Sequence, residues 1–216
     1  MKRGTRGVLA TLVPALLAIA ALPACAQPKV FNVLRLSTAS FKSEGLLETV
    51  MGTTAGPGIT GSLTVDLARP AGATGTISVD LTMIRTGIER RDEAMRSEQF
   101  LNTERAVNRL AVFDIKGIEI AGPLEPGREA PAKVRGTLTV KGRPVELVAD
   151  ARVTYLRLAP AEVEARRQSG YTSEILRVKA KFQTSFTNHG MAIPQFYFLR
   201  LADEIQLEAD LILVHG

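Results

Sequence analysis

Apolar and polar residues alternate along most of the chain after residue 30, and this spacing sends successive side chains to opposite faces of a β-strand. In the segment 76–85 the odd-numbered positions are apolar up to Met83, and the even-numbered positions are polar up to Thr82. The same period recurs in residues 63–67, 111–115, 134–140, 145–155, 176–186 and 205–213. About seven or eight such strands predict an all-β protein, either an antiparallel barrel or a sandwich.

Glycine and proline gather between these runs and predict turns. Gly reaches backbone conformations with positive φ, and Pro fixes turn geometry, so both residues separate strands. We expect hairpin loops at four segments: Gly56-Pro57-Gly58, Arg69-Pro70-Ala71-Gly72, Gly122-Pro123 with Pro126-Gly127, and Lys141-Gly142-Arg143-Pro144. With no internal repeat, these strands and turns predict a single domain.

Two segments break the strand pattern and predict short helices. Residues 89–101 are rich in helix formers. Thr86, three residues before Glu89, fits a capping box, in which a hydroxyl and a carboxylate bind free amides at the helix start. Residues 160–168 begin with Pro160 and are followed by Gly170, which are typical start and stop signals. We expect this second helix to lie across an end or a side of the barrel or sandwich.

The first 26 residues have the pattern of a signal peptide, with a basic start, an apolar run over 8–22 and small residues before the cleavage site. Cleavage after Ala26 would remove Cys25. The alternative is a lipobox, which Leu22-Pro23-Ala24-Cys25 resembles; residues 1–24 are then removed and Cys25 is lipidated. We expect a domain of residues 27–216 that is periplasmic or secreted, or an outer-membrane lipoprotein held by an N-terminal lipid anchor. No later apolar stretch approaches the roughly 20 residues of a transmembrane helix.

Composition and charge exclude several classes of function. The formal net charge is +5, but beyond residue 26 there are 24 basic and 22 acidic side chains, so no nucleic-acid surface is indicated. Aromatic residues make up 5% of the chain and Trp is absent, so any interior is lined by aliphatic groups. His189 and His215 are the only histidines and Cys25 is the only cysteine. We therefore expect no metal site and no intrachain disulfide.

Three motifs could indicate chemistry, and each favours a structural interpretation. Gly56-Pro57-Gly58-Ile59-Thr60-Gly61 matches the Gly-x-Gly-x-x-Gly dinucleotide pattern, but a strand pattern follows where that motif needs a helix. Asp92 and Glu93 diverge by roughly 100° if they lie on a helix, so they do not form an acid–base pair. His189 lies in Thr187-Asn188-His189-Gly190 without a Gly-x-Ser-x-Gly elbow, which predicts a turn. We expect no catalytic residue and no enzymatic activity.

Residues 86–100 (TGIERRDEAMRSEQF) resemble the Thr-Gly…Arg-Asp…Met-x-Ser…Phe signature of the YceI-like, polyisoprenoid-binding family. Three further segments follow in that family's order and spacing: Leu110-Ala111-Val112-Phe113, Gly136-Thr137-Leu138-Thr139-Val140-Lys141-Gly142 and Phe186-Thr187-Asn188-His189-Gly190. The resemblance covers nearly all residues after 26. It departs from the family at Phe41-Lys42-Ser43-Glu44, which lacks the usual histidine, and at Arg109, where proline is usual. The head group of the ligand is therefore left open.

The resemblance implies a lipocalin-like antiparallel β-barrel of about eight strands. Its interior would hold a polyisoprenoid, an isoprenoid quinone or a fatty-acid derivative, without cofactor chemistry. We predict lipid contacts at Phe41 and Phe100 near an opening, and at Leu81, Met83, Phe113, Leu138, Val140, Phe182 and Phe186 along the cavity.

A second group of residues is expected near the lipid head group. Thr86, Arg91 and Asp92 would form a network that fastens the first helix to the barrel. Two alternatives remain: a structural or protein-interaction barrel without lipid, and a hydrolase or isomerase that uses Arg91 and Asp92. Whether the protein forms a homodimer also stays open.

Overall fold

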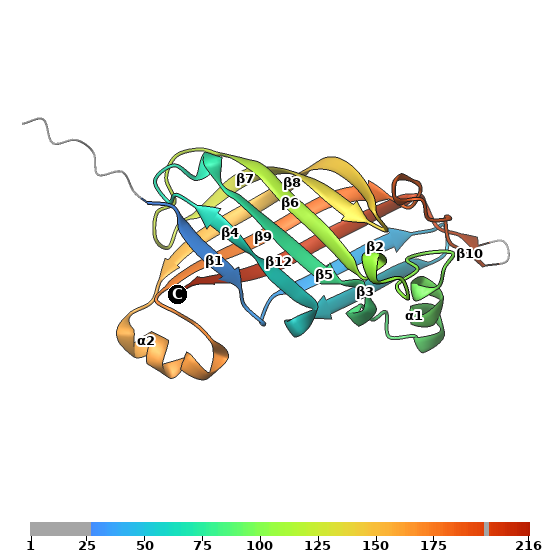
Figure 1. Cartoon of the computed structure of the whole chain (residues 1–216), viewed down its shortest axis with the longest axis horizontal. Coiled ribbons are helices and arrows are strands. Elements are labelled where there is room, and N and C mark those ends of the chain that lie inside the picture. The colour runs from blue at the N-terminus through green and yellow to red at the C-terminus, as the bar shows by residue number, and fades with distance from the viewer. Residues whose placement is uncertain (1–26, 197–198) are drawn as a thin grey trace, which may run out of the picture.

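The computed structural model describes residues 27–196 and 199–216 (Figure 1). The predicted signal peptide, with Cys25, lies outside the described residues. The helices in the described ranges are α1 (Glu89–Arg96) and α2 (Pro160–Ala165). The strands are β1 (Lys29–Val33), β2 (Thr38–Glu44), β3 (Thr49–Ala55), β4 (Ile59–Val65), β5 (Thr74–Asp80), β6 (Leu110–Ile120), β7 (Glu129–Val140), β8 (Arg143–Arg157), β9 (Glu174–Ser185), β10 (Gln195–Phe196), β11 (Leu199–Arg200) and β12 (Glu204–His215).

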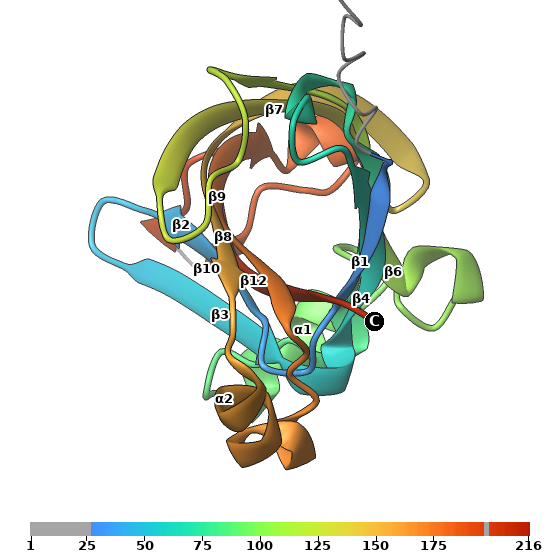
Figure 2. The same cartoon turned by 90° about the vertical axis from the view of Figure 1, so that its left-hand side faces the viewer.

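Eight strands close into an antiparallel barrel, as predicted. They are hydrogen-bonded in the order β1-β4-β5-β6-β7-β8-β9-β12, and β1 pairs with β12 to complete the ring. Figure 2 shows this ring along the barrel axis. A closed ring leaves no free edge along these strands, which removes the usual site of edge-to-edge aggregation.

The β2–β3 hairpin extends the barrel wall at one end. The first part of β12 pairs with β2, whereas its last residues pair with β1. Strands β1 and β2 therefore lie end to end along β12. In the same way β3 pairs with β2, and β4 pairs with β1. Gly56-Pro57-Gly58 therefore forms a bend between two consecutive segments of one wall strand, and its prediction as a hairpin loop was wrong. The bend needs glycine, because Gly56 has φ +63° and a Cβ at Gly58 would lie 2.4 Å from Thr54 Oγ1.

The other three predicted turns do connect paired strands. Residues 69–72 lie between β4 and β5, residues 122–127 lie between β6 and β7, and Lys141-Gly142 joins β7 to β8. Lys141 and Gly142 both have positive φ, +52° and +71°, as a tight two-residue hairpin turn requires. Arg143 and Pro144, which were predicted in this turn, already belong to β8.

The two helices lie at opposite ends of the barrel, which we call the α1 end and the α2 end (Figure 1). Helix α2 begins at Pro160, and a short 3-10 turn after it stops at Gly170, which is left-handed with φ +80°, as predicted. Helix α1 is shorter than the predicted 89–101 because Ser97 is already extended. The predicted capping box is absent: Ile88 is the N-cap of α1, and the Thr86 hydroxyl donates instead to Asp92.

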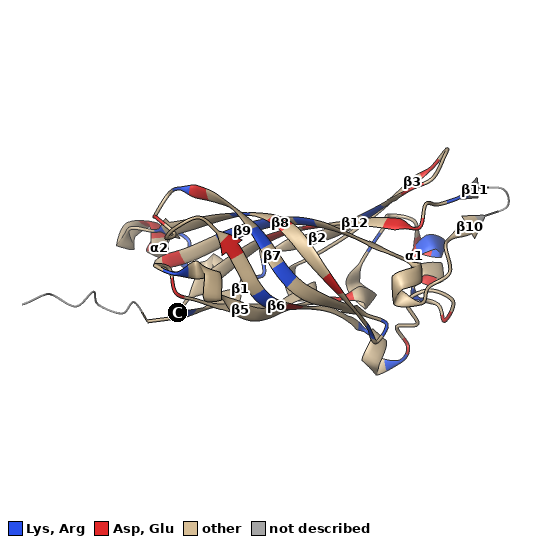
Figure 3. Ribbon diagram, turned by 90° about the horizontal axis from the view of Figure 1, so that it is seen from above, with Lys and Arg blue, Asp and Glu red and all other residues tan. Residues whose placement is uncertain are grey.

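Lys, Arg, Asp and Glu residues are distributed along the strands of the barrel wall (Figure 3). Several form ion pairs between neighbouring strands, such as Lys133 with Asp150 at 2.8 Å and Lys181 with Glu208 at 2.6 Å. Exposed pairs of this kind stabilise a fold by about 1 kcal/mol or less each. Most of the stability must therefore come from the apolar side chains that alternate with them and point inward.

Candidate functional site

A row of alanines crosses the inner wall of the barrel. Five alanines are direct cross-strand neighbours, on β2, β12, β9, β8 and β7 in that order: Ala39, Ala209, Ala180, Ala151 and Ala132. Larger inward side chains lie beside them on the same strands, such as Val153 on β8 and Phe182 on β9. Because a methyl group cannot reach the barrel axis, this alanine row leaves the middle of the barrel open.

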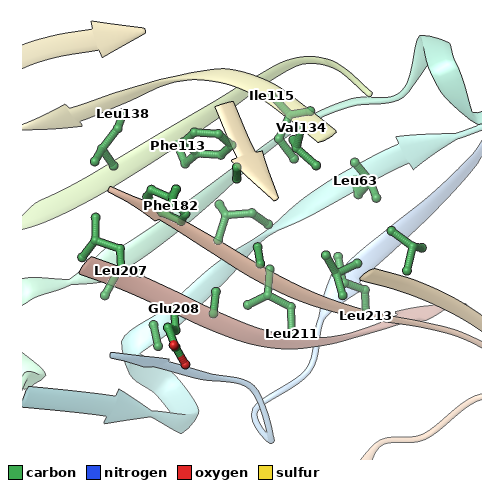
Figure 4. A pocket seen from close by; sticks show the side chains of 18 of the residues that line it. Leu63, Phe113, Ile115, Val134, Leu138, Phe182, Leu207, Glu208, Leu211 and Leu213 are labelled. Atoms are coloured by element: carbon green, nitrogen blue, oxygen red, sulfur yellow. The ribbon is translucent and has the colours of Figure 1, made fainter. Parts of the chain in front are cut away.

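A cavity of about 160 Å³, the deep chamber, lies beside the alanine row. Apart from Ser40, Thr54 and Glu208, every residue that lines it is apolar. Phe113 and Phe182 stack in its wall, with ring centroids 5.6 Å apart, as Figure 4 shows. Two loops at the α2 end cover the far side of this chamber with Pro70 and Leu124.

A second cavity of about 210 Å³, the mouth chamber, lies at the α1 end. Its lining includes Met95 and Ala94 of helix α1, together with Phe100 and Val140. Ala94 is exposed and Arg91 is half-buried, so the chamber reaches solvent beside α1.

Six residues line both chambers, and we call them the collar. They are Phe41, Leu81, Ile84, Ala111, Leu138 and Leu207. All six are apolar and come from both sides of the barrel. The two chambers therefore adjoin at the collar, and we call the chambers and the collar together the apolar path, which extends from the α1 end past the alanine row toward the α2 end.

Eight of the nine residues predicted to contact a lipid line this path. Phe113 and Phe182 line the deep chamber. The others line the mouth chamber or the collar: Phe41, Leu81, Phe100, Leu138, Val140 and Phe186. Their placement is geometric, and contact with a lipid stays a prediction.

Met83 is the exception, because it lines neither chamber. Strand β5 ends at Asp80, whose carboxylate accepts a hydrogen bond from the Thr82 amide at 2.9 Å. A 3-10 turn over Leu81–Met83 follows, so the strand alternation that placed Met83 inward no longer applies. Met83 lies instead beside Gly58, where an added Cβ would be 3.3 Å from the Met83 Cβ.

Thr86, Arg91 and Asp92 form the predicted network. Asp92 is 3% exposed, and its Oδ1 accepts hydrogen bonds from the Thr86 amide at 2.8 Å and the Thr86 hydroxyl at 2.6 Å. Burial raises the pKa of Asp92, but these bonds and the charges of Arg96 and Arg85 outweigh it, so the pKa is lowered. Thr86 and Arg91 line the mouth chamber, whereas Asp92 lines neither chamber. The Asp92 carboxylate therefore holds the loop before α1 in place.

His189 is a chamber residue that sequence reasoning assigned only to a turn. The turn is present, as a 3-10 turn over Thr187–His189 that ends at the left-handed Gly190. The His189 ring is fully buried and lines the mouth chamber. Nδ1 lies 3.2 Å from the Arg143 carbonyl, which can only accept, so Nδ1 carries the proton and Nε2 accepts from the Thr184 hydroxyl at 2.8 Å. Burial lowers the pKa of His189, although the bond to Arg143 acts against this.

Ile84, Ile205 and Leu207 also line the path without having been singled out. Ile205 and Leu207 belong to the alternating run over 205–213, so their inward orientation was visible in the sequence. Their place next to the opening was not visible, because it depends on how β12 pairs with β2. Within the described ranges, no group of three or more His, Cys, Asp or Glu side chains could hold a metal ion. Neither helix in these ranges is long and apolar enough to cross a membrane.

A model of the YceI-like domain matches residues 35–213 of the chain. Among curated proteins, none matches the sequence. Several solved structures share the fold. BcnA of Burkholderia cenocepacia is 16% identical with a TM-score of 0.60, over 82% of this chain and 95% of that one.

Two further structures extend the comparison. A polyisoprenoid binding domain from Saccharophagus degradans is 14% identical with a TM-score of 0.61, over 88% of this chain and 100% of that one. The YceI protein of Campylobacter jejuni is 15% identical with a TM-score of 0.57, over 77% and 85%. At these identities the likeness establishes the fold.

Proposed function

The chain belongs to the YceI-like family, and from this premise we propose that it is an exported, non-enzymatic protein that holds a long apolar lipid inside its barrel. The observation that carries the proposal is the apolar path through the deep chamber, the collar and the mouth chamber. The similarity to the polyisoprenoid binding domain from Saccharophagus degradans supports the same class of ligand.

The path fits a flexible chain better than a compact polar molecule. Binding would come from removing apolar surface from water, at roughly 25 cal/mol per Å². The deep chamber offers few polar partners, and in the mouth chamber the His189 and Thr184 side chains already bond to each other or to backbone. A polyisoprenoid, an isoprenoid quinone or a fatty-acid derivative meets these conditions, with its polar end beside Arg91 at the solvent opening.

Export and processing are part of the proposal. The signal-peptide pattern of residues 1–26 supports a periplasmic or secreted protein, and the lipobox-like sequence before Cys25 supports an outer-membrane lipoprotein as the alternative. The mass of the mature N-terminus separates these routes, because only the lipoprotein retains Cys25 with acyl chains.

Native mass spectrometry of the protein purified from cells tests the ligand. We expect an adduct whose mass is that of an apolar lipid and which organic extraction removes. Phe182→Asp places an unpaired charge in the deep chamber and should abolish the adduct. Val148→Asp makes the same type of change on the outer face of β8, where Val148 is 49% exposed, and should leave the adduct unchanged. An adduct-free native protein that also binds no added lipid would favour the structural barrel.

A further inference from the structure

The tip of the β2–β3 hairpin carries two exposed leucines at the α1 end. Leu46 is 94% exposed and Leu47 is 74% exposed, more than any other large apolar side chain in the described residues. Figure 3 shows the hairpin reaching out from the barrel on the side where α1 lies. Exposed leucines at the end of a projecting hairpin cost solvation free energy in water, which points to an apolar partner.

The tip is a direct continuation of the chamber wall. Ser43 and Val50 are cross-strand partners in this hairpin, and both line the mouth chamber. Leu46 follows Ser43 by three residues and Leu47 precedes Val50 by three residues, in the turn between β2 and β3. An apolar partner that covers the tip would therefore also lie against the opening of the lipid path.

Both carboxylates of the tip segment, residues 44–48, are paired within the protein, and the exposed Arg200 lies beside this segment, because Gly45 pairs with Leu201. Glu48 pairs with Arg91, with 3.3 Å between Oε1 and Nη1, and Glu44 pairs with Lys42. No carboxylate within residues 44–48 is left unpaired, so we expect the attraction of the two leucines to a partner to be apolar in origin.

The small size of the tip argues against a protein partner. Two leucines offer on the order of 100–300 Å² of apolar surface, whereas a stable interface between two protein chains buries roughly 1,200 Å² or more. A lipid bilayer accepts so small a contact, because apolar side chains can enter the boundary between head groups and acyl chains individually.

From these observations we infer that Leu46 and Leu47 insert into the surface of a lipid bilayer and place the mouth chamber against the acyl region. This inference rests on the proposed lipid-binding function, because it identifies where the ligand enters and leaves. The contact is weak and reversible, and it does not depend on anionic head groups.

Flotation with phosphatidylcholine vesicles tests the docking step. We expect the full protein to float with vesicles, equally at low and raised salt and with or without added phosphatidylglycerol. The double variant Leu46→Ser/Leu47→Ser should reduce vesicle binding by at least about tenfold and slow lipid transfer between vesicles. The control variant Leu36→Ser/Val148→Ser removes two apolar side chains that are about half exposed and lie away from the tip, and should bind as the native protein does.

Three results would overturn the inference: flotation that persists in the tip variant, binding that requires phosphatidylglycerol and disappears in salt, or a change of oligomeric state in the tip variant with no change in vesicle binding. Binding of a detergent-dispersed isoprenoid is measured in parallel. Loss of vesicle binding with retained isoprenoid binding in the tip variant supports docking. If the native protein floats with vesicles but binds no isoprenoid, the proposed lipid-binding function is refuted, while the docking of the tip on a bilayer is not.

Discussion

Ala180 lies in the middle of the alanine row and lines the deep chamber. Replacing it with leucine tests whether the barrel is hollow. A single large-to-small substitution can open a cavity of roughly 150 Å³, so the reverse substitution should fill much of a chamber of about 160 Å³. We expect Ala180→Leu to abolish lipid binding while the barrel stays folded.

The stability change gives the sharper result. In a packed core, added methylenes cost about 1–3 kcal/mol through strain. In an empty chamber they gain up to about 0.8 kcal/mol each from burial, so the unfolding free energy of Ala180→Leu should stay unchanged or rise by up to about 2 kcal/mol.

Ala132 provides the matched control. It belongs to the same row and is buried, but it is not among the residues that line either chamber. Ala132→Leu should lower the unfolding free energy by about 1–3 kcal/mol. Urea unfolding followed by circular dichroism measures both variants, since the chain has no Trp for fluorescence. Equal destabilisation of the two variants, or lipid retained by Ala180→Leu, would refute the reasoning.

Two further predictions concern polar groups at the α1 end. His189 has a lowered pKa in the folded state, so the unfolded chain binds more protons near pH 6. The contribution of neutral His189 to the unfolding free energy is full above the unfolded pKa of about 6.5 and is lost as the pH falls toward the folded pKa. Urea unfolding at about pH 7 and pH 5 should therefore show a smaller loss of unfolding free energy in His189→Gln than in the native protein. An equal loss in both proteins would contradict the assignment of a neutral, buried His189. Asp92→Ala removes the acceptor of both Thr86 hydrogen bonds and should lower the unfolding free energy by about 2–3 kcal/mol. The exposed neighbour Glu93→Ala should change it by about 0.5 kcal/mol or less, and similar melting curves for both variants would argue against an anchoring role for Asp92.

Sequence alternation predicted most of the barrel wall, from β4 to β9 and β12, but it did not identify the strands before residue 59. The reason lies in the side chains of β2 and β3. Their inward positions include Ser43, Gly52 and Thr54, which are small or polar although they face the interior. Side chains in these strands point alternately inward and outward, but apolar and polar residues do not alternate with them. The bend at Gly56-Pro57-Gly58 was read as a hairpin for the same reason, since no pairing partner was visible on either side of it.

The sequence predicted many of the residues that line the two chambers, but it did not predict the chambers themselves. Alternation showed that Ala180 and Ala209 face inward together with larger side chains. That they align in one row follows from cross-strand register, which depends on turn geometry. A cavity is a property of several strands at once, so a single strand cannot reveal it. The position of Met83 outside both chambers has a local origin, because β5 ends at Asp80 and a 3-10 turn over Leu81–Met83 follows.

Strand β1 begins at the α2 end, where Lys29 donates to Glu174 at the start of β9, and the mouth chamber opens at the other end. A protein molecule acylated at Cys25 would be tethered to a membrane at the α2 end, which is opposite the opening of the mouth chamber. Its opening would then face away from the membrane that holds it, whereas a released copy would be free to turn its opening toward that membrane.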